Sequence, residues 1–600
     1  MFEIPLKDMV FNVEHVADLA SIARLPGLGE AGIDTASAVL EESARFNEGV
    51  LAPLNRVGDQ EPPTLNNGVV KTSPGFKEAF EQFAAGGWQG IQHPEVYGGA
   101  ALPKLIATPC IEMINSANLS FALCPLLTDG AIEALLTAGS DQLREQYLPK
   151  LVSGQWTGTM NLTESQAGSD LSLVSSKAVP QADGSYRVSG QKIFITFGEH
   201  DMAENIVHLV LARTPGAPEG VKGISLFLVP KFLVNDDGSL GKRNDVWCPS
   251  IEHKLGLHGS PTAVLLFGDD KGEVGPGAIG YLVGEENRGL QTMFIMMNAA
   301  RFGVGMQGIA VAERAYQHAL AYAKERIQSR DVGGSSGPVA IIQHPDVRRM
   351  LMTIKAMTEG ARALAYYAAA AHDHSHHNPD AELKKHNQLV YELLVPIVKG
   401  WSTEMSLEAT SLGVQVHGGM GFIEETGAAQ FYRDARILTI YEGTTAIQAN
   451  DLVGRKSVRD GGATMKHLIE QMLATQAQLA GSGQEDLVAI GAQMAPAAAA
   501  LAAVVDYIVS TSQSDPHAAY AGSVPYLKMA GIVFSGWQLA RSALIAHRQL
   551  DEADADKGFL TAKISTARYF AEHILPQSAA IENSILGGAS ATMALDIDQF

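Results

Sequence analysis

The hydrophobic period of the chain changes twice, and this limits the possible folds more than any other feature. Between about Ala31 and Gln155, apolar residues recur every three to four positions, as in amphipathic helices. From about Trp156 the period becomes two, in short segments separated by polar and glycine-rich turns, which is typical of β-strands. After Phe294 the helical period returns. The sequence therefore predicts an α+β protein with helical, β and helical parts in this order.

The length and the positions of these changes predict four domains. With 600 residues, of which 46% are hydrophobic, the chain can bury several cores. We expect a helical domain at 1–157, an antiparallel β-domain at 158–285, a helical bundle at 286–456 and an additional helical domain at 457–600. Four β-domain segments have strand periodicity: YRVSGQKIFITF, IVHLVLART, GISLFLVPKF and PTAVLLFGD.

Cysteine usage and the first residues favour a cytoplasmic protein. Cys110, Cys124 and Cys248 lie far apart without CxxC spacing, which indicates free thiols in a reducing compartment rather than disulfides or a zinc site. The opening segment MFEIPLKDMVFNVEHV mixes charged and apolar residues, and it lacks the basic and apolar regions of a signal peptide.

Charge and hydropathy disfavour two classes of partner. A formal net charge of −21 disfavours nonspecific attraction to nucleic acid or anionic lipid. The most apolar stretch, APAAAALAAVVDYIVS, is alanine-rich and interrupted by Asp506, so it is expected to be a buried helix without stable membrane insertion.

Two motifs match patterns for dinucleotide or metal binding, but the surrounding sequence does not favour either function. GVGMQG (Gly303–Gly308) fits the dinucleotide fingerprint GxGxxG, but the surrounding pattern predicts one continuous helix rather than a strand, turn and helix. Close helix packing through small residues is the better interpretation. His372 and His376 are four residues apart and could present two metal ligands, but an Asn-Pro pair follows. A helix end is favoured there, and no metal site is expected.

Three polar segments allow either binding or ordinary structure. MNLTESQAGSDLSL (Met160–Leu173) could hold an anionic or heteroaromatic ligand, although its residues also form plain turns. QVHGGMGF (Gln415–Phe422) could bring backbone amides close to phosphates, but taken by itself it is better interpreted as a helix C-cap. In TIYEGTTAIQ, Glu442 stands in an apolar, hydroxyl-rich segment, as a buried structural carboxylate or a base with a raised pKa.

The order of the motifs is more specific than any one of them. They are LTESQAGSD, GQKIFITFG, NRGL with AARFGVG, YAKER, QVHGGMGF with YRDARI, and IYEGTTAIQ. Over roughly its first three quarters the chain resembles the FAD-dependent acyl-CoA dehydrogenase family. Its length, PLKDM opening, HPDVRRML segment and C-terminal extension resemble a large bacterial subfamily that includes 3-methylmercaptopropionyl-CoA dehydrogenases and some fatty acyl-CoA dehydrogenases.

The resemblance implies a fold and a set of site residues. The family fold is an N-terminal helical domain, a middle β-domain and a C-terminal four-helix bundle, here with an extra helical extension. Glu442 matches the catalytic base. Some relatives place the base on the helix that here reads NAARFG, where Ala299 and Ala300 cannot act as bases. The residues that match flavin-ring contacts are Met160, Leu162, Thr163, Phe194 and Thr196.

The other matched positions concern the distal parts of both ligands. Those that match contacts to the FAD pyrophosphate and adenosine are Arg326, Gln415, Gly418 and Gly419, and Thr444 matches another FAD contact. Ser169, Asn298 and Arg301 match CoA contacts, and Gly443 would let the thioester approach the backbone. Three departures from the family pattern are Phe194 for tryptophan, Asn298 for aspartate, and QSRDVGGSSG for Thr-Phe-Gly after Arg326.

The implied reaction is the α,β-dehydrogenation of an acyl-CoA thioester to the trans-2-enoyl-CoA. Glu442 would take the α proton and FAD the β hydride, and electrons would pass to electron-transfer flavoprotein. A homo-oligomer, favoured as a dimer, is implied because FAD contacts in the family commonly cross a subunit boundary.

Two alternatives and the acyl group stay open. An acyl-CoA oxidase shares the fold and the base. A nucleic-acid-binding flavoprotein would require a basic C-terminal extension, whereas acidic residues are prominent here at Asp551, Glu552, Asp554 and Asp556. The acyl group could be a fatty acyl chain or 3-methylmercaptopropionyl.

Overall fold

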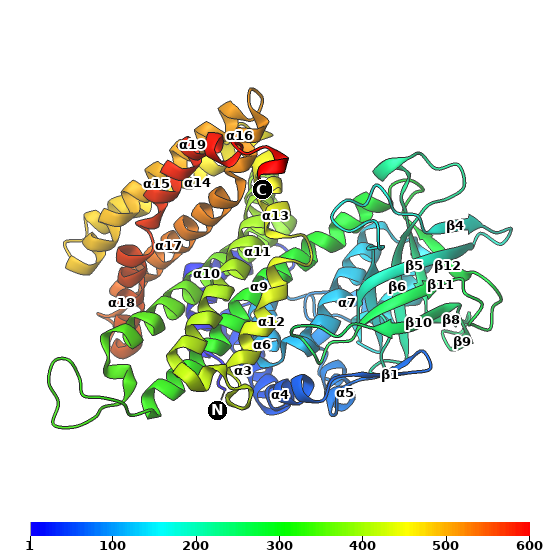
Figure 1. Cartoon of the computed structure of the whole chain (residues 1–600), viewed down its shortest axis with the longest axis horizontal. Helices are drawn as coiled ribbons and strands as arrows, with labels where there is room; N and C mark the ends of the chain where they lie inside the picture. Colours follow the sequence, from blue (N-terminus) through cyan, green and yellow to red (C-terminus); the bar gives the residue numbers. More distant parts are fainter. Residues whose placement is uncertain (1) are drawn as a thin grey trace. The chain divides into compact units, whose positions relative to one another are not determined.

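A computed structural model describes residues 2–600 of the chain (Figure 1). The chain divides into two compact units. The helical unit comprises Met1–Arg45, Pro103–Ser116 and Val304–Phe600, and the sheet unit comprises Phe46–Leu102 and Ala117–Gly303. Along the chain the elements follow the predicted order of helices, strands and helices, which is therefore confirmed.

The sheet unit is built on one large sheet with the strand order β10-β11-β5-β12-β7-β6-β3, to which β4 adds by pairing with β5. Its strands are β3 (Trp156–Asn161), β4 (Lys177–Pro180), β5 (Tyr186–Thr196), β6 (Asn205–Ala212), β7 (Ser225–Pro230), β10 (Val246–Ile251), β11 (Thr262–Phe267) and β12 (Ala278–Val283). A separate hairpin joins β8 (Phe232–Val234) to β9 (Leu240–Arg243). The predicted antiparallel domain is confirmed, with one parallel pairing between β3 and β6.

The four segments with strand periodicity form β5, β6, β7 and β11. The helices of this unit are α4 (Ala52–Gln60), α5 (Phe76–Ala85), α7 (Leu119–Ala138) and α8 (Asp141–Val152). Helix α7 lies directly on β3, because a Cβ at Gly158 would be only 2.4 Å from the Ala131 Cβ. The Gly158 amide donates to Thr128 Oγ1 at 3.0 Å, so glycine permits both the close approach and this hydrogen bond.

A short hairpin interrupts the region that was expected to be helical. Strands β1 (Thr64–Asn66) and β2 (Val69–Lys71) are joined by Asn67 and Gly68, whose φ angles are 48° and 75°. Asn-Gly is the usual pair for such a two-residue turn. The sequence signal was therefore present but outweighed by the surrounding helical pattern.

The helical unit contains the remaining α-helices. They are α1 (Leu6–Phe11), α2 (Leu19–Ala23), α3 (Ile33–Phe46), α6 (Lys104–Ala117), α9 (Gly289–Glu325), α10 (Pro345–His377), α11 (Ala381–His417), α12 (Ala428–Ala435) and α13 (Thr445–Asp451). Helices α3, α6 and α9 extend past the boundaries between the units. The C-terminal extension adds α14 (Ala463–Ala480), α15 (Glu485–Thr511), α16 (Pro516–Ala521), α17 (Ser523–Gln549), α18 (Lys557–His573) and α19 (Gln577–Thr592).

The glycines of the GVGMQG motif lie inside α9, and their role is helix packing. A Cβ at Gly305 would lie 2.6 Å from Val398 Cγ1, and a Cβ at Gly308 would lie 2.3 Å from the Ser402 backbone oxygen. Both contacts are with α11. The interpretation as small residues that allow close helix packing is confirmed.

Helix α17 of the C-terminal extension packs against α10 and α11. The Trp401 ring of α11 sits over Gly531, where a Cβ would be 2.3 Å from the ring. Trp401 Nε1 donates to Ser535 Oγ at 3.0 Å, and Leu527 covers Gly400. The extension therefore covers the helices that precede the candidate catalytic segment.

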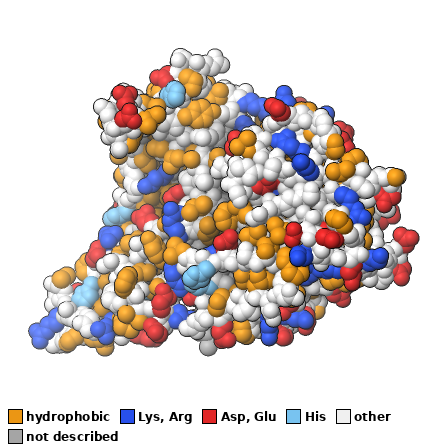
Figure 2. All heavy atoms as spheres, turned by 45° about the vertical axis from the view of Figure 1, so that its right-hand side comes forward, with side chains coloured by type: hydrophobic (Ala, Val, Ile, Leu, Met, Phe, Trp, Pro, Cys, Tyr) orange, Lys and Arg blue, Asp and Glu red, His pale blue; other side chains and the backbone are white. Residues whose placement is uncertain are grey.

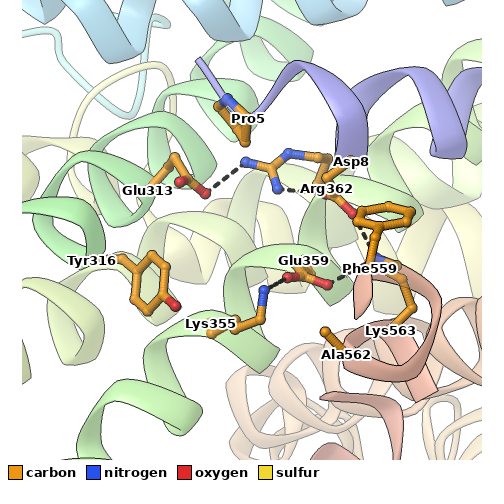
Figure 3. Close-up of a pocket in the computed structure, with 10 residues that line it drawn as sticks. All are labelled: Pro5, Asp8, Glu313, Tyr316, Lys355, Glu359, Arg362, Phe559, Ala562 and Lys563. Atoms are coloured by element: carbon orange, nitrogen blue, oxygen red, sulfur yellow. Dashed lines mark hydrogen bonds and ion pairs between the residues drawn. The ribbon is translucent and has the colours of Figure 1, made fainter. Parts of the chain in front are cut away.

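Buried charges join the N-terminal segment and the extension to α9 and α10 around a cavity of about 130 Å³ (Figure 3). Arg362 donates to Asp8 at 2.8 Å and to Glu313 at 2.9 Å, and Lys563 of α18 donates to Glu359 at 2.8 Å. Burial alone would raise the pKa of Asp8, but Lys563 and Arg362 outweigh it and hold that pKa well below its usual range. Helix α18 is thus fixed by buried charges.

Two helices are long and apolar enough to cross a membrane by length and composition, α7 and α15. The most apolar window of α7 is 78% buried in the protein, and that of α15 is 50% buried. Helix α15 includes the alanine-rich stretch and contacts α14, α17, α18 and α19. On the face shown in Figure 2, basic side chains are interspersed with acidic ones rather than gathered in one continuous patch.

Candidate active site

Glu442 lies in a sharp turn between η9 (Arg436–Thr439) and α13. Its φ angle is 54°, and that of Gly443 is 88°, so two consecutive residues have left-handed backbone. This conformation costs a residue with a side chain about 1–2 kcal/mol. Thr444 then begins α13 as its N-cap, with its hydroxyl accepting from the Ile447 amide. We call Tyr441–Thr444 the catalytic turn.

Two buried side chains hold the backbone oxygens of the catalytic turn. Lys399 of α11, which is 0% exposed, donates from Nζ to the Leu438 oxygen at 2.9 Å and to the Gly443 oxygen at 2.7 Å. Gln448 of α13 donates from Nε2 to the oxygens of Glu442 and Gly443, both at 3.2 Å. The strained turn is therefore held from α11 and from α13.

Tyr441 anchors the turn on a third side. Its hydroxyl donates to Gln307 Oε1 of α9 in a short hydrogen bond. Burial, followed by the nearby charge of Glu442, raises the pKa of Tyr441 well above its usual range. The phenol therefore keeps its proton and remains a donor at neutral pH.

In the sheet unit, the matched flavin-ring residues come together at the end of β3 and on β5. The Ile193 amide donates to the Thr163 oxygen at 3.0 Å, which joins the two segments. Lys192 Nζ donates to the Leu162 oxygen at 3.0 Å and to Glu164 Oε1 at 2.8 Å. A buried ion pair thus supports the backbone that carries Leu162 and Thr163.

The pKa values of Glu164 and Lys192 are both lowered, but for different reasons. Burial opposes the charge of Glu164, but Lys192 and the hydroxyls of Ser175 and Ser176 lower the pKa of Glu164 to about 2. Burial lowers the pKa of Lys192 to about 8, although Glu164 acts in the opposite direction. Both groups are therefore charged at pH 7.

An extra residue in β5 sets the direction of the matched aromatic side chain. Across the pairing with β11, Ile195 faces Ala263 while Lys192 faces Leu265, so β5 contains one residue more than its partner. Phe194 lies in this bulge with a φ of 60° and is 60% exposed. Bulges commonly redirect side chains beside active sites. Here the bulge leaves an aromatic ring on the surface near Thr163.

The residues matched to CoA contacts differ in exposure. Ser169 is exposed in the loop after β3, and Asn298 is exposed on α9. Arg301 is buried, and its Nη1 lies 3.5 Å from Asn298 Oδ1. Arg301 is therefore placed to orient Asn298.

The residues matched to distal FAD contacts lie at the ends of α9 and α11. Gly418 ends α11 with a φ of 60°, so the C-cap interpretation is correct for the backbone. The His417 ring lies 4.5 Å from the Tyr322 ring, one turn before Arg326. A Cβ at Gly418 or Gly419 would meet nothing within 4 Å. The Gly418 amide donates to the Gln415 oxygen, and both glycines are exposed close to the end of α9.

The two histidines considered as metal ligands lie near the end of α10. Their rings stack with centroids 4.1 Å apart, and His376 Nδ1 lies 2.9 Å from the His372 backbone oxygen. In residues 2–600 no group of three or more His, Cys, Asp or Glu side chains is arranged to hold a metal ion.

Family models match the chain along most of its length. The acyl-CoA dehydrogenase N-terminal, middle and C-terminal domain models match residues 35–155, 159–269 and 287–456. A further model, acetyl-CoA dehydrogenase C-terminal like, matches 465–596.

Individual relatives agree with these models. The chain is 53% identical to a 3-methylmercaptopropionyl-CoA dehydrogenase of Ruegeria pomeroyi, over 97% of this chain and 98% of that protein. It is 36% identical to the broad-specificity linear acyl-CoA dehydrogenase FadE5 of Mycobacterium tuberculosis, over 95% of each chain. A similar fold is found in Caenorhabditis elegans ACDH-11, solved with C11-CoA, with a TM-score of 0.75, 21% identity and coverage of 98% and 95% of the two chains.

The chain therefore belongs to the acyl-CoA dehydrogenase family. It is an FAD-dependent oxidoreductase that dehydrogenates acyl-CoA thioesters. The family uses acyl-CoA substrates and electron-transfer flavoproteins.

Sequence reasoning did not identify Lys399, Gln448, Lys192 or Glu164 as parts of the site. A signal existed for two of them, because Lys192 falls at a buried position of the β5 alternation and Lys399 interrupts the apolar run VPIVKGW. The pattern could not show which oxygens these ammonium groups bind, because those oxygens belong to segments distant in sequence.

Replacing Glu164 with glutamine should weaken FAD retention in a pH-dependent way. At pH 7 the change leaves Lys192 buried without its carboxylate, which costs about 3 kcal/mol. The Glu164 pKa is lowered by folding, so its contribution is complete above about pH 4.5 and is lost as pH falls towards 2. The measurement is the urea midpoint of FAD release at pH 7 and pH 3.5, followed by flavin fluorescence.

The gap between wild type and Glu164→Gln should be widest at pH 7 and narrower at pH 3.5. Glu219→Gln, a change at an exposed position in the same unit, should stay within about 0.5 kcal/mol of wild type at both pH values. An equal gap at the two pH values would refute this account of the ion pair.

Proposed function

We propose that Glu442 is the base that removes the α proton of an acyl-CoA and that the preferred substrate is 3-methylmercaptopropionyl-CoA. The base assignment rests on the left-handed turn that fixes Glu442 and on its match to the family motif. The substrate assignment rests on one observation, the 53% identity to the Ruegeria pomeroyi enzyme over nearly the whole of both chains.

The residues present fit FAD. Phe194 offers an exposed aromatic face, and Thr163 and Thr196 are only partly buried beside it. Gly418 and Gly419 are exposed and have open space where a Cβ would lie, so a phosphate group could approach the backbone there. Met160, Leu162, Thr163, Phe194 and Thr196 would hold the ring, and Arg326, Gln415, Gly418, Gly419 and Thr444 the rest of the cofactor. When bound, FAD would accept the β hydride.

The chain's own residues provide proton transfer, orientation and charge stabilisation. Glu442 takes the α proton as the α C–H bond breaks, and the product is the trans-2-enoyl-CoA. The Glu442 amide donates to the thioester oxygen as negative charge develops there. Gly443 lets the thioester approach, because it carries no side chain at the turn. Ser169, Asn298 and Arg301 hold the CoA portion at a distance from the reacting carbons.

Electron-transfer flavoprotein is the proposed acceptor, and the cytoplasm is the proposed location. Cys110, Cys124 and Cys248 are free thiols and are buried, as suits a protein of a reducing compartment.

A homodimer is proposed because apolar side chains are exposed beside the open glycines. Phe422 is 87% exposed, and Met420, Ile423 and Tyr432 are also exposed on the adjacent elements. Apolar groups gathered in this way are typical of protein interfaces. A partner subunit that covers them would approach the exposed backbone at Gly418 and Gly419 and complete the FAD site.

Glu442→Gln should abolish flavin reduction while FAD and acyl-CoA still bind. The amide cannot accept the α proton, so the rate of flavin bleaching under anaerobic conditions should fall at least about 1,000-fold. Stopped-flow absorbance with excess substrate measures the rate. Glu425→Gln, at an exposed position on η8 (Glu424–Thr426), is the control and should bleach at the wild-type rate. Near-normal bleaching by Glu442→Gln would remove Glu442 as the base.

The kcat/KM for 3-methylmercaptopropionyl-CoA should be higher than that for acyl-CoA thioesters with longer chains. The comparison uses 3-methylmercaptopropionyl-CoA, pentanoyl-CoA, in which a methylene replaces the sulfur, and octanoyl-CoA. Because one methylene in a fitted pocket changes kcat/KM by about 10-fold or more, octanoyl-CoA should react at least about 10-fold less efficiently. An artificial electron acceptor provides the readout. Higher kcat/KM for octanoyl-CoA would contradict the substrate assignment.

Phe422→Glu should dissociate the dimer and weaken FAD binding. A carboxylate at the centre of an apolar interface cannot be buried without a partner charge, so association should be lost. Sedimentation velocity gives the mass, and flavin fluorescence gives the Kd for FAD. Ile597→Glu, at a position 91% exposed in the C-terminal segment, is the matched control. A wild-type monomer, or an unchanged Phe422→Glu dimer, would disprove the proposed interface.

A further inference from the structure

We propose that Lys399 and Gln448 are positioning residues for the reaction, which hold the catalytic turn so that Glu442 meets the substrate α carbon. This inference rests on the proposed role of Glu442 as the base. Lys399 Nζ and Gln448 Nε2 both donate to backbone oxygens of the turn region, so both side chains can fix its position.

The catalytic turn needs such support. Glu442 has a φ of 54° and Gly443 a φ of 88°, and a residue with a side chain adopts left-handed backbone only when its surroundings fix it. Without external hydrogen bonds, Glu442 would relax towards ordinary backbone, and its carboxylate would move with it.

Lys399 closes the segment that leads into the turn. Its ammonium group joins the Leu438 oxygen, which precedes the turn, to the Gly443 oxygen within it, at 2.9 and 2.7 Å. Charge-assisted hydrogen bonds of this length are about twice as strong as neutral ones. A single side chain therefore fixes both ends of the segment that contains Glu442.

Gln448 acts on the peptide group of Glu442 itself. Its Nε2 donates to the Glu442 oxygen and to the Gly443 oxygen, both at 3.2 Å. A Cβ at Gly443 would lie 2.7 Å from this nitrogen, so glycine is required for the amide to reach the backbone. Gln448 is 0% exposed, so this contact is shielded from bulk solvent.

The consequence for the reaction is geometric. A displacement of about 1 Å between a base and its target can lower the rate about 100-fold. Poorer alignment makes removal of the α proton slower, so the isotope effect of α,α-dideuterated substrate on flavin reduction should increase. A loss of overall stability would lower the amount of holoenzyme but not the rate per bound FAD.

The test uses Lys399→Met and Gln448→Met in the full-length holoenzyme. Methionine keeps much of the volume and removes the donors. Flavin reduction is followed by anaerobic stopped flow with protiated and α,α-dideuterated 3-methylmercaptopropionyl-CoA, and rates are expressed per bound FAD. We expect about a 100-fold loss for Lys399→Met and about a 10-fold loss for Gln448→Met, a larger isotope effect in both, and KM changed less than kcat.

Lys563→Met is the matched control. It removes another fully buried ammonium group of the helical unit, one that pairs with Asp8 and Glu359 instead of the catalytic turn. Its melting temperature should fall while its rate per bound FAD and its isotope effect stay at wild-type values. This separates positioning from stability.

The outcomes distinguish the two proposals. If Glu442→Gln bleaches normally, the base assignment fails and this inference falls with it. If Glu442→Gln is inactive while Lys399→Met reduces flavin at the wild-type rate with an unchanged isotope effect, only the positioning role is overturned. Should Lys399→Met not retain FAD, Gln448→Met decides: a 10-fold loss with a larger isotope effect supports the inference, and wild-type values overturn it.

Discussion

The helical unit depends on one short stretch of α11, residues 398–402. These five consecutive residues contact three different neighbours, which are α9, the catalytic turn and α17. Val398 and the Ser402 backbone meet the glycines of α9, Lys399 holds the catalytic turn, and Gly400 and Trp401 receive α17. Because successive residues of a helix point about 100° apart, such a stretch can contact elements on all sides only if it is fully enclosed. The buried lysine is thus fixed by the packing around it.

This arrangement gives the C-terminal extension a physical connection to the chemistry. Trp401 lies two residues after Lys399, the lysine that reaches the catalytic turn. It packs against Gly531 of α17 and donates to Ser535. Farther along, the charges of Asp8, Glu359 and Lys563 fix α18 to α10. The extension therefore encloses the helices behind the turn, and this exclusion of water strengthens the hydrogen bonds that Lys399 makes.

The sequence predicted the architecture well because the architecture follows from hydrophobic period. The strands β5, β6, β7 and β11 and the helix through GVGMQG were all expected, and the motif around Glu442 led to its proposed role as the base. What could not be predicted depends on local departures from period or on distant partners. The left-handed bulge at Phe194 shifts the alternation of β5, and the Asn67-Gly68 hairpin lies within a helical pattern. Lys192 pairs with Glu164, which is distant from it in sequence. The carbonyl groups that Lys399 binds are also distant from it in sequence.

A base placed on a turn must be as immobile as one on a helix, and contacts to the backbone of the turn contribute to this. Lys399 and Gln448 bind peptide oxygens, and Tyr441 uses its own side chain to reach Gln307 on α9. These contacts fix the main chain of Glu442. Holding the peptide groups of the turn gives precise placement of the carboxylate, which suits a reaction that must remove a weakly acidic C–H proton.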